Sequence, residues 1–274
     1  MQKICHHFCR PCIHCSYYYL CKDILYNLND SISGLLMVAL GQENSNDSPF
    51  VPETDLCEFI NLADSTSSCN NLPAYPLSLR LSTGQVVNSV PIITGGCKSD
   101  CVSNVYKFDI KSNSWLSLGN LATPRYLHSS TILDGALLII GGLDSGNYYL
   151  NSTELVYPND TITSGPDLPT PRAFHCSVQL EGRKIVIIGG GNTFDLDGNH
   201  KMTTIYDPVT STYTNGPDML FDHYNFGCAH FYSQKHGGRP VVLSAGGGYG
   251  GGHGGSKAEV YDYTLENGTW EESK

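Results

Sequence analysis

The chain has 274 residues, of which 29 are glycine, and its 16 lysines and arginines against 26 aspartates and glutamates give a net charge of −10. Only 15% of the residues are charged, which argues against a helical bundle or coiled coil and favours β-structure with many turns. The acidic balance argues against binding to nucleic acid or to an anionic membrane surface, and no apolar run is long enough for a transmembrane helix.

Residues 1–50 differ from the rest of the chain and predict an atypical cysteine-rich leader. The apolar run 35–40 followed by Gly41 resembles the end of a secretion signal, which would be cleaved near residue 41. The alternative is a short buried segment, because the polar sequence upstream lacks the basic start of such a signal. Five early cysteines could hold zinc, but they lack the spacing of paired knuckles, so we predict a leader without a metal site. They are Cys5, Cys9, Cys12, Cys15 and Cys21.

Six further cysteines follow Gly41, and two pairs are close enough in sequence to be candidate disulfides. These pairs are Cys57–Cys69 and Cys97–Cys101. Sequons for N-glycosylation begin at Asn29, Asn46, Asn151, Asn159 and Asn267. Together these features slightly favour an extracellular, secreted protein over a cytoplasmic chain with small buried thiols.

Four aliphatic segments end in a glycine pair, and the pairs lie 46, 48 and 57 residues apart. A short apolar run closed by glycine predicts a strand buried on both faces, whose glycines allow a sharp turn and a close approach of neighbouring backbone. The pairs are Gly95–Gly96, Gly141–Gly142, Gly189–Gly190 and Gly246–Gly247. Each is followed by a second strand and then by an anchor residue. The anchors are Trp115, Ile162, Tyr213 and Trp270.

Four strands per unit at a period near 50 resemble the kelch-repeat family of β-propellers, in which a spaced tyrosine and tryptophan follow the glycine pair. The resemblance covers about residues 57–274 and departs from the pattern at Ile162 and Tyr213. It implies an all-β propeller of radially packed four-stranded blades. We expect this domain at 51–274, with a half blade at 57–73 and blades at about 77–121, 123–168, 171–219 and 224–272.

About four and a half blades fall short of the six or seven that usually close a kelch ring. We therefore expect a fragment, an incomplete reading frame or an unusual closure.

The resemblance also implies that binding residues lie in the loops after the glycine pairs and in the linkers between blades. The loops span about 97–104, 143–152, 191–203 and 247–257, and the linkers about 121–126, 168–173 and 219–225. The candidate binding residues are Arg125, Tyr148, Tyr149, Arg172, Asp195, His200, His223 and Tyr249. Arg125 and Arg172 recur at one repeat position, and His128 and His175 at another, which favours buried bonds between blades over catalysis.

Two loops match ligand-binding motifs only in part. The segment 246–255 lacks the Gly-Lys-Ser/Thr order of a phosphate loop, and 195–199 lacks the full set of calcium ligands, so we interpret both as surface loops. No hydrolase motif is visible. We predict a non-catalytic protein–protein interaction module without a cofactor. The alternatives are a secreted disulfide-bonded glycoprotein that contacts matrix or carbohydrate, the substrate-recognition part of a ubiquitin-ligase adaptor, and a propeller of the copper-oxidase type.

Overall fold

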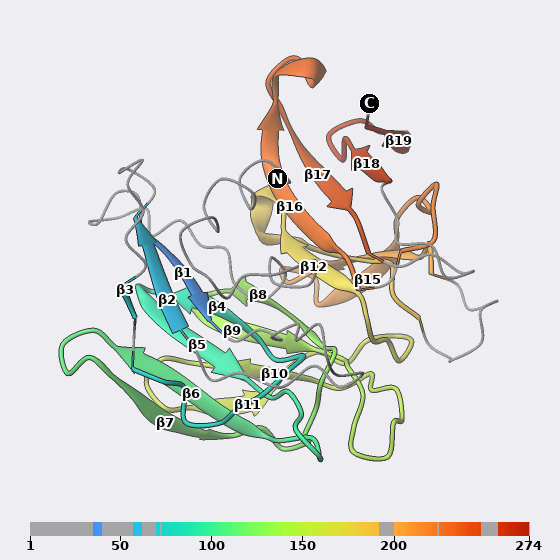
Figure 1. Ribbon diagram of the computed structural model, residues 1–274. Coiled ribbons are helices and arrows are strands. Elements are labelled where there is room, and N and C mark those ends of the chain that lie inside the picture. The colour runs from blue at the N-terminus through green and yellow to red at the C-terminus, as the bar shows by residue number, and fades with distance from the viewer. Residues whose placement is uncertain are drawn as a thin grey trace, which may run out of the picture. The chain divides into compact units, whose positions relative to one another are not determined.

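The computed structural model describes residues 73–191, 200–223, 225–247 and 257–273, together with the backbone of strands at 35–39, 57–61 and 70–71. These residues form antiparallel sheets and two short 3₁₀ helices (Figure 1). The chain divides into two compact units, Met1–Tyr126 with Pro158–Asp160, and Leu127–Tyr157 with Thr161–Lys274.

The first unit begins with a three-stranded sheet in the order β1-β2-β3. Its strands are β1 (Leu35–Ala39), β2 (Cys57–Asn61) and β3 (Asn70–Asn71). The sequence predicted a half blade of two strands here, and β1 lies in the apolar run that also resembles a secretion signal. This run forms a strand, β1, that pairs antiparallel with β2. Cleavage near residue 41 stays a prediction.

The first complete blade also lies in this unit. It consists of β4 (Thr83–Val87), β5 (Val90–Thr94), β6 (Asn104–Asp109) and β7 (Ser114–Asn120), in that order. The ring of Trp115 is buried and packs edge-on against Tyr75 and Phe108, with ring centroids 5.0 and 5.1 Å away. Large rings in such contacts contribute more than their buried area alone, so this anchor ties the blade to the segment before it.

The second unit holds three more four-stranded sheets, and the prediction of four-stranded blades is confirmed. The second blade has β8 (Ser129–Leu133), β9 (Ala136–Ile140), β10 (Thr153–Val156) and β11 (Ile162–Ser164). The third has β12 (Cys176–Gln179), β13 (Ile185–Ile188), β14 (Thr203–Asp207) and β15 (Thr212–Asn215). The fourth has β16 (Gly227–Ser233), β17 (Arg239–Ala245), β18 (Ala258–Tyr261) and β19 (Trp270–Glu272). The helices η1 (Glu181–Arg183) and η2 (Gln234–His236) join β12 to β13 and β16 to β17.

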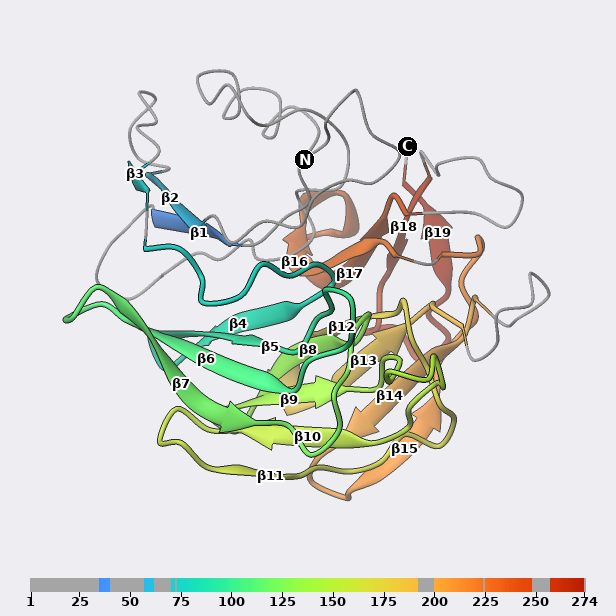
Figure 2. The ribbon, with the colours of Figure 1, turned by 60° about the horizontal axis from the view of Figure 1, so that its bottom comes forward.

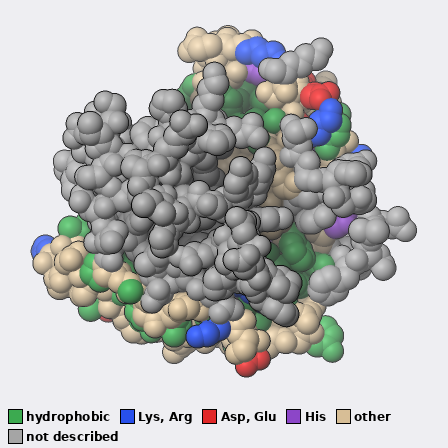
Figure 3. Space-filling model, viewed as in Figure 1, with side chains coloured by type: hydrophobic (Ala, Val, Ile, Leu, Met, Phe, Trp, Pro, Cys, Tyr) green, Lys and Arg blue, Asp and Glu red, His purple; other side chains and the backbone are tan. Residues whose placement is uncertain are grey.

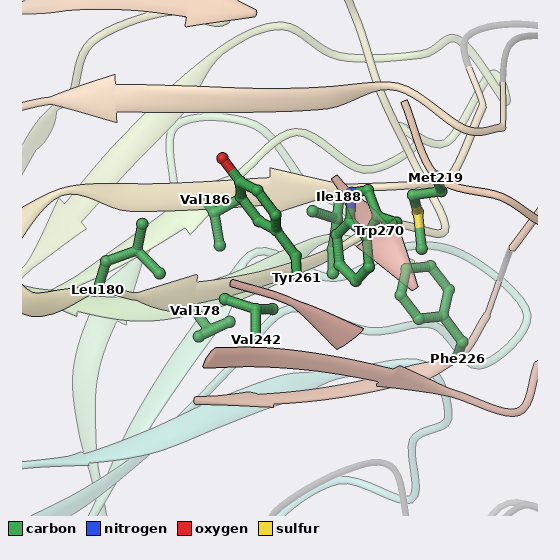
Figure 4. Close-up of a cluster of buried hydrophobic side chains, with 9 residues drawn as sticks. All are labelled: Val178, Leu180, Val186, Ile188, Met219, Phe226, Val242, Tyr261 and Trp270. Atoms are coloured by element: carbon green, nitrogen blue, oxygen red, sulfur yellow. The ribbon is translucent and has the colours of Figure 1, made fainter. Parts of the chain in front are cut away.

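Within the second unit, the blades pack face to face, and their first strands β8, β12 and β16 lie next to one another (Figure 2). Buried side chains from the third and fourth blades and from the linker between them interdigitate (Figure 4). They are Val178, Leu180, Val186, Ile188, Met219, Phe226, Val242, Tyr261 and Trp270. The sheets therefore bury their apolar faces against each other, which a single blade cannot do.

The glycine pairs close each second strand where the next linker crosses it. Gly141 and Gly190 adopt left-handed backbone conformations, with φ of 55° and 72°. A Cβ atom at Gly141 would lie 2.3 Å from the carbonyl oxygen of Arg172, and one at Gly190 would lie 2.3 Å from that of Ala173. Only glycine fits this combination of conformation and close approach, which explains why the pair recurs at the repeat.

The linkers of the second unit carry a repeated backbone bond between successive blades. Leu127, Phe174 and Asn225 have φ of 53°, 61° and 58°, a conformation unfavourable for bulky side chains. The N–H of Phe174 donates to the carbonyl oxygen of Leu127 at 3.0 Å, and the N–H of Asn225 donates to that of Phe174 at 2.9 Å. The third and fourth blades are thus each held in register with the blade before through main-chain atoms.

Candidate functional site

The end of each blade that carries the glycine pair is the predicted binding end, and it is built from repeated main-chain bonds. The second glycine of three pairs donates its N–H to the carbonyl oxygen of the residue at one linker position, each at 2.8 Å. The bonds join Gly96 to Arg125, Gly142 to Arg172 and Gly190 to His223. The same linker position therefore holds arginine twice and histidine once.

Arg172 is only 4% exposed and bonds to the next blade. Its guanidinium donates to the Ile187 carbonyl oxygen at 3.2 Å and to the Thr204 Oγ1 atom at 3.0 Å. Burial lowers the pKa of this guanidinium from 12.5 to about 10. Arg172 joins β13 and β14 to the linker, as the recurrence of arginine indicated, and contact of this buried side chain with a partner stays a prediction.

Arg125 occupies the equivalent position and is also buried, and its contact with a partner stays a prediction. Its Nε–H donates to the carbonyl oxygen of Thr123 at 3.4 Å, and its own carbonyl accepts from Gly96. The recurring histidines His128 and His175 are buried as well. Recurrence at these positions therefore marks buried residues.

His223 is the third residue at this position, and it forms a buried pair with Glu259 of β18. The side chains are 2% and 0% exposed, and the His223 Nε2 atom lies 2.9 Å from the Glu259 Oε1 atom. The His223 Nδ1 atom lies 2.9 Å from the Gly246 carbonyl oxygen, so both ring nitrogens face oxygen acceptors. His223 lies beneath the last glycine pair, and its contact with a partner stays a prediction.

Glu259 was not singled out from the sequence, since a glutamate in a strand usually faces solvent. Besides His223, its carboxylate accepts the backbone N–H of Leu220 at 2.7 Å and that of Phe221 at 3.3 Å. The pair thus fixes the linker between the third and fourth blades.

Tyr148 is the predicted binding residue that the structure places most openly, with 73% of its surface exposed. The turn beneath it is ordered by Asp144, whose Oδ1 atom accepts the N–H of Gly146 at 2.8 Å and that of Tyr148 at 3.0 Å. Tyr149 is half-buried and pairs with Leu143 across the turn. A large, exposed ring on a short, internally bonded turn is suited to binding, because little conformational entropy is lost.

Of the other predicted loop residues, the structure describes His200 but not Asp195 and Tyr249. His200 is half-buried, and its Nδ1 atom lies 2.9 Å from the Gly190 carbonyl oxygen, so it closes its own loop. Asp195 and Tyr249 lie outside the described residues. The exposed candidate site therefore consists of the loop 143–150 with Tyr148 at its tip.

A disulfide joins Cys176 of β12 to Cys228 of β16, two residues 52 positions apart. It links the first strands of adjacent blades, a pairing that the sequence did not predict. The predicted Cys97–Cys101 disulfide is not formed: Cys97 is a buried thiol, and its backbone pairs with Arg80. The side chain of Cys57 and all of Cys69 lie outside the described residues.

On the face that Figure 3 shows, the acidic and basic side chains of the described residues lie scattered among apolar and other polar groups. Within the part of the chain that the structure describes, three or more His, Cys, Asp or Glu side chains nowhere gather as metal ligands would. No helix of that part is long and apolar enough to cross a membrane.

Comparison with known proteins agrees with this geometry, although no protein-family model matches the chain. A putative F-box/kelch-repeat protein of Arabidopsis thaliana is 30% identical over 124 residues, 43% of this chain and 33% of that protein. A second F-box/kelch-repeat protein of that plant is 27% identical over 154 residues, 52% of this chain and 40% of that protein. A solved structure titled "Structure of YjhT" has a TM-score of 0.61 at 11% identity, over 94% of this chain and all of that one.

The repeats of this chain are kelch repeats, and the fold is the kelch β-propeller. A kelch domain-containing protein of Sulfurisphaera tokodaii is also similar, with 26% identity over 170 residues, 60% of this chain and 24% of that protein. The chain thus spans less than half the length of each of these curated relatives. In kelch terms, Arg125, Arg172 and His223 belong to the blade linkers, and Tyr148 belongs to a loop that follows a glycine pair.

Proposed function

We propose that the chain is a non-catalytic protein–protein interaction module that binds its partner through the loops after the glycine pairs. The observation that carries this proposal is the 73% exposed Tyr148 on a turn held by Asp144. Tyrosine is enriched among the residues that dominate protein interfaces, since it brings a large ring with few rotatable bonds. The kelch repeats of the F-box/kelch relatives support a role in binding proteins.

A pair of exposed tyrosines allows a matched experiment. A photo-reactive phenylalanine is placed at position 148 or at position 232, because Tyr232 is 61% exposed but lies in β16 near η2. The protein cross-linked from position 148 is identified, purified and titrated with the full-length chain. We expect Tyr148→Ala to weaken binding at least tenfold and Tyr232→Ala to leave it unchanged. Equal affinities of the two variants would overturn the proposal.

A second candidate function is that of a secreted, disulfide-bonded protein that contacts matrix or carbohydrate. It is favoured by the Cys176–Cys228 disulfide, because stable disulfides form mainly in oxidising compartments. A ubiquitin-ligase adaptor would instead work in the reducing cytosol, as the F-box names of the relatives suggest for those proteins. Thiol alkylation of the chain in intact cells separates the two, since an adaptor would present Cys176 and Cys228 as free thiols.

A further inference from the structure

The part of the chain that the structure describes contains three N-glycosylation sequons, and the asparagine of each is exposed. Asn151 lies just before β10, Asn159 lies in the turn between β10 and β11, and Asn267 lies in the turn between β18 and β19. Asn159 and Asn267 therefore occupy the same turn of two different blades. A glycan is large and hydrophilic and can be carried only where the asparagine faces water.

The turn around Asn267 shows how such a site is presented. Asp262 orders the start of the turn, where its Oδ1 atom accepts the N–H of Thr264 at 3.1 Å and its hydroxyl at 2.6 Å. The N–H of Gly268 donates to the carbonyl oxygen of Leu265 at 3.1 Å and closes the other side. Leu265 is 46% exposed beside Asn267, so a glycan here would lie over an apolar side chain that otherwise meets water.

The disulfide between Cys176 and Cys228 is an independent indication of the compartment. Two cysteines 52 residues apart are brought together by the packing of β12 on β16. Such a bond persists where thiols are oxidised, which is also where oligosaccharides are transferred to asparagine. Exposure of the sequons and oxidation of the cysteines are different observations that agree on one environment.

We propose that Asn151, Asn159 and Asn267 carry N-linked glycans. In the transfer, the side-chain amide nitrogen forms a bond to C1 of an oligosaccharide carried on a polyprenyl diphosphate. The bond between C1 and the diphosphate oxygen breaks, the amide proton is lost to a base, and the polyprenyl diphosphate leaves. No oxidation or reduction occurs in this step.

This inference does not depend on the protein-binding role. The glycosylation proposal and the secreted candidate function require the same oxidising compartment, and they have nothing else in common. It does add one consequence for the binding loop, since Asn151 lies three residues from Tyr148. A glycan at Asn151 would restrict the direction from which a partner reaches that ring.

The test expresses the full chain with its own N-terminus in eukaryotic cells and maps its peptides by mass spectrometry before and after N-glycosidase. We expect each of the three asparagines to be converted to aspartate by the enzyme. Thr269→Ala should remove the glycan at Asn267, whereas Thr269→Ser preserves the sequon and should retain it. Asn151→Gln and Asn159→Gln should each remove one glycan. Asn215→Gln, which changes an exposed asparagine outside any sequon, should remove none.

In a second arm of the experiment, the expressed chain carries a foreign secretion signal in place of residues 1–41. Glycans in both arms support the proposal. Glycans found only with the foreign signal also support it, whereas bare asparagines in that arm overturn it, because the chain would then have met the transferring enzyme without being modified. The Tyr148 titration compares variants that keep all three sequons, so failure of one proposal leaves the other measurable.

Discussion

The indole N–H of Trp270 donates to the carbonyl oxygen of Pro217, 3.2 Å away in the linker that precedes the fourth blade. The same bond joins Trp115 to Pro73 at 3.1 Å, and the hydroxyl of Tyr213 reaches Pro166 at 2.7 Å. In these three blades the anchor residue thus donates a hydrogen bond to the segment that precedes its own blade. Ile162, the anchor of the second blade, has no donor with which to form this bond.

This relationship predicts that Trp270→Ala lowers the free energy of unfolding by about 3–5 kcal/mol, because it empties a buried site and removes the donor. Trp270→Phe keeps a ring and should cost clearly less, since it loses mainly the bonds to Pro217 and Thr203. Urea unfolding followed by circular dichroism measures both. Equal losses in the two variants would contradict the packing role of the ring.

The buried pair of His223 and Glu259 predicts that stability depends on which side chain occupies the third linker position. His223→Ala leaves the Glu259 carboxylate buried without its partner and should lower the free energy of unfolding by about 3–5 kcal/mol. His223→Arg restores the residue that two other repeats hold there and should cost much less. Denaturant midpoints of the two variants make the comparison. If arginine were no better than alanine, the contact with Glu259 would not be the stabilising one.

The disulfide predicts a redox-dependent stability. Closing a separation of 52 residues should stabilise the fold by about 4 kcal/mol through the entropy of the unfolded chain. We expect the double variant Cys176→Ser/Cys228→Ser to unfold at a lower denaturant concentration than the oxidised protein. Adding a reductant should bring the unmodified protein down to the level of the variant. An oxidised protein indifferent to reductant would rule out this contribution.

His230 predicts a loss of stability at acid pH. Its partial burial lowers the pKa of the imidazole below the ordinary value of 6.5, against a smaller opposing effect of the Glu181 carboxylate. The unfolded chain therefore takes up a proton at a pH where the folded chain does not, and stability falls as the pH drops below about 6.5.

The substitution His230→Gln should reduce this loss of stability at acid pH. Thermal unfolding at a series of pH values measures the loss in both proteins. Tyr263→Phe serves as a second check, because the Tyr263 hydroxyl lies 2.8 Å from the His230 Nε2 atom. If stability fell equally steeply with pH in His230→Gln, the acid sensitivity would belong to other groups.

The blades could be predicted from the sequence because a physical requirement repeats along it. A strand buried on both faces must be apolar, and the crossing linker leaves no room for a Cβ atom at Gly141 and Gly190. The strand β1 could not be separated from a secretion signal, since both are short apolar runs. The Cys176–Cys228 pair was missed because closeness in sequence favoured other cysteines, whereas closeness in space depends on how two blades pack.

The candidate site was predicted less well, and arginine shows why. Arginine is mostly exposed in proteins, so its place in a linker suggested contact with a partner. Recurrence at Arg125 and Arg172 pointed to the buried role instead, and the structure supports that second interpretation. Tyr148 is not part of the repeat pattern: it lies in the loop after the second glycine pair, and it is exposed. In this chain the unrepeated residue is the better candidate for binding.

The left-handed residues Leu127, Phe174 and Asn225 also bear on which parts of the chain can vary in length. Phe174 and Asn225 each donate to the blade before them, so a residue added to or removed from a linker would shift a whole blade out of register. The stretches 121–128, 168–175 and 219–226 accordingly have the same length, whereas the glycine pairs are unequally spaced. Insertions are therefore absorbed elsewhere, which leaves loops such as 143–150 as the places where a peptide could be grafted without disturbing the blades.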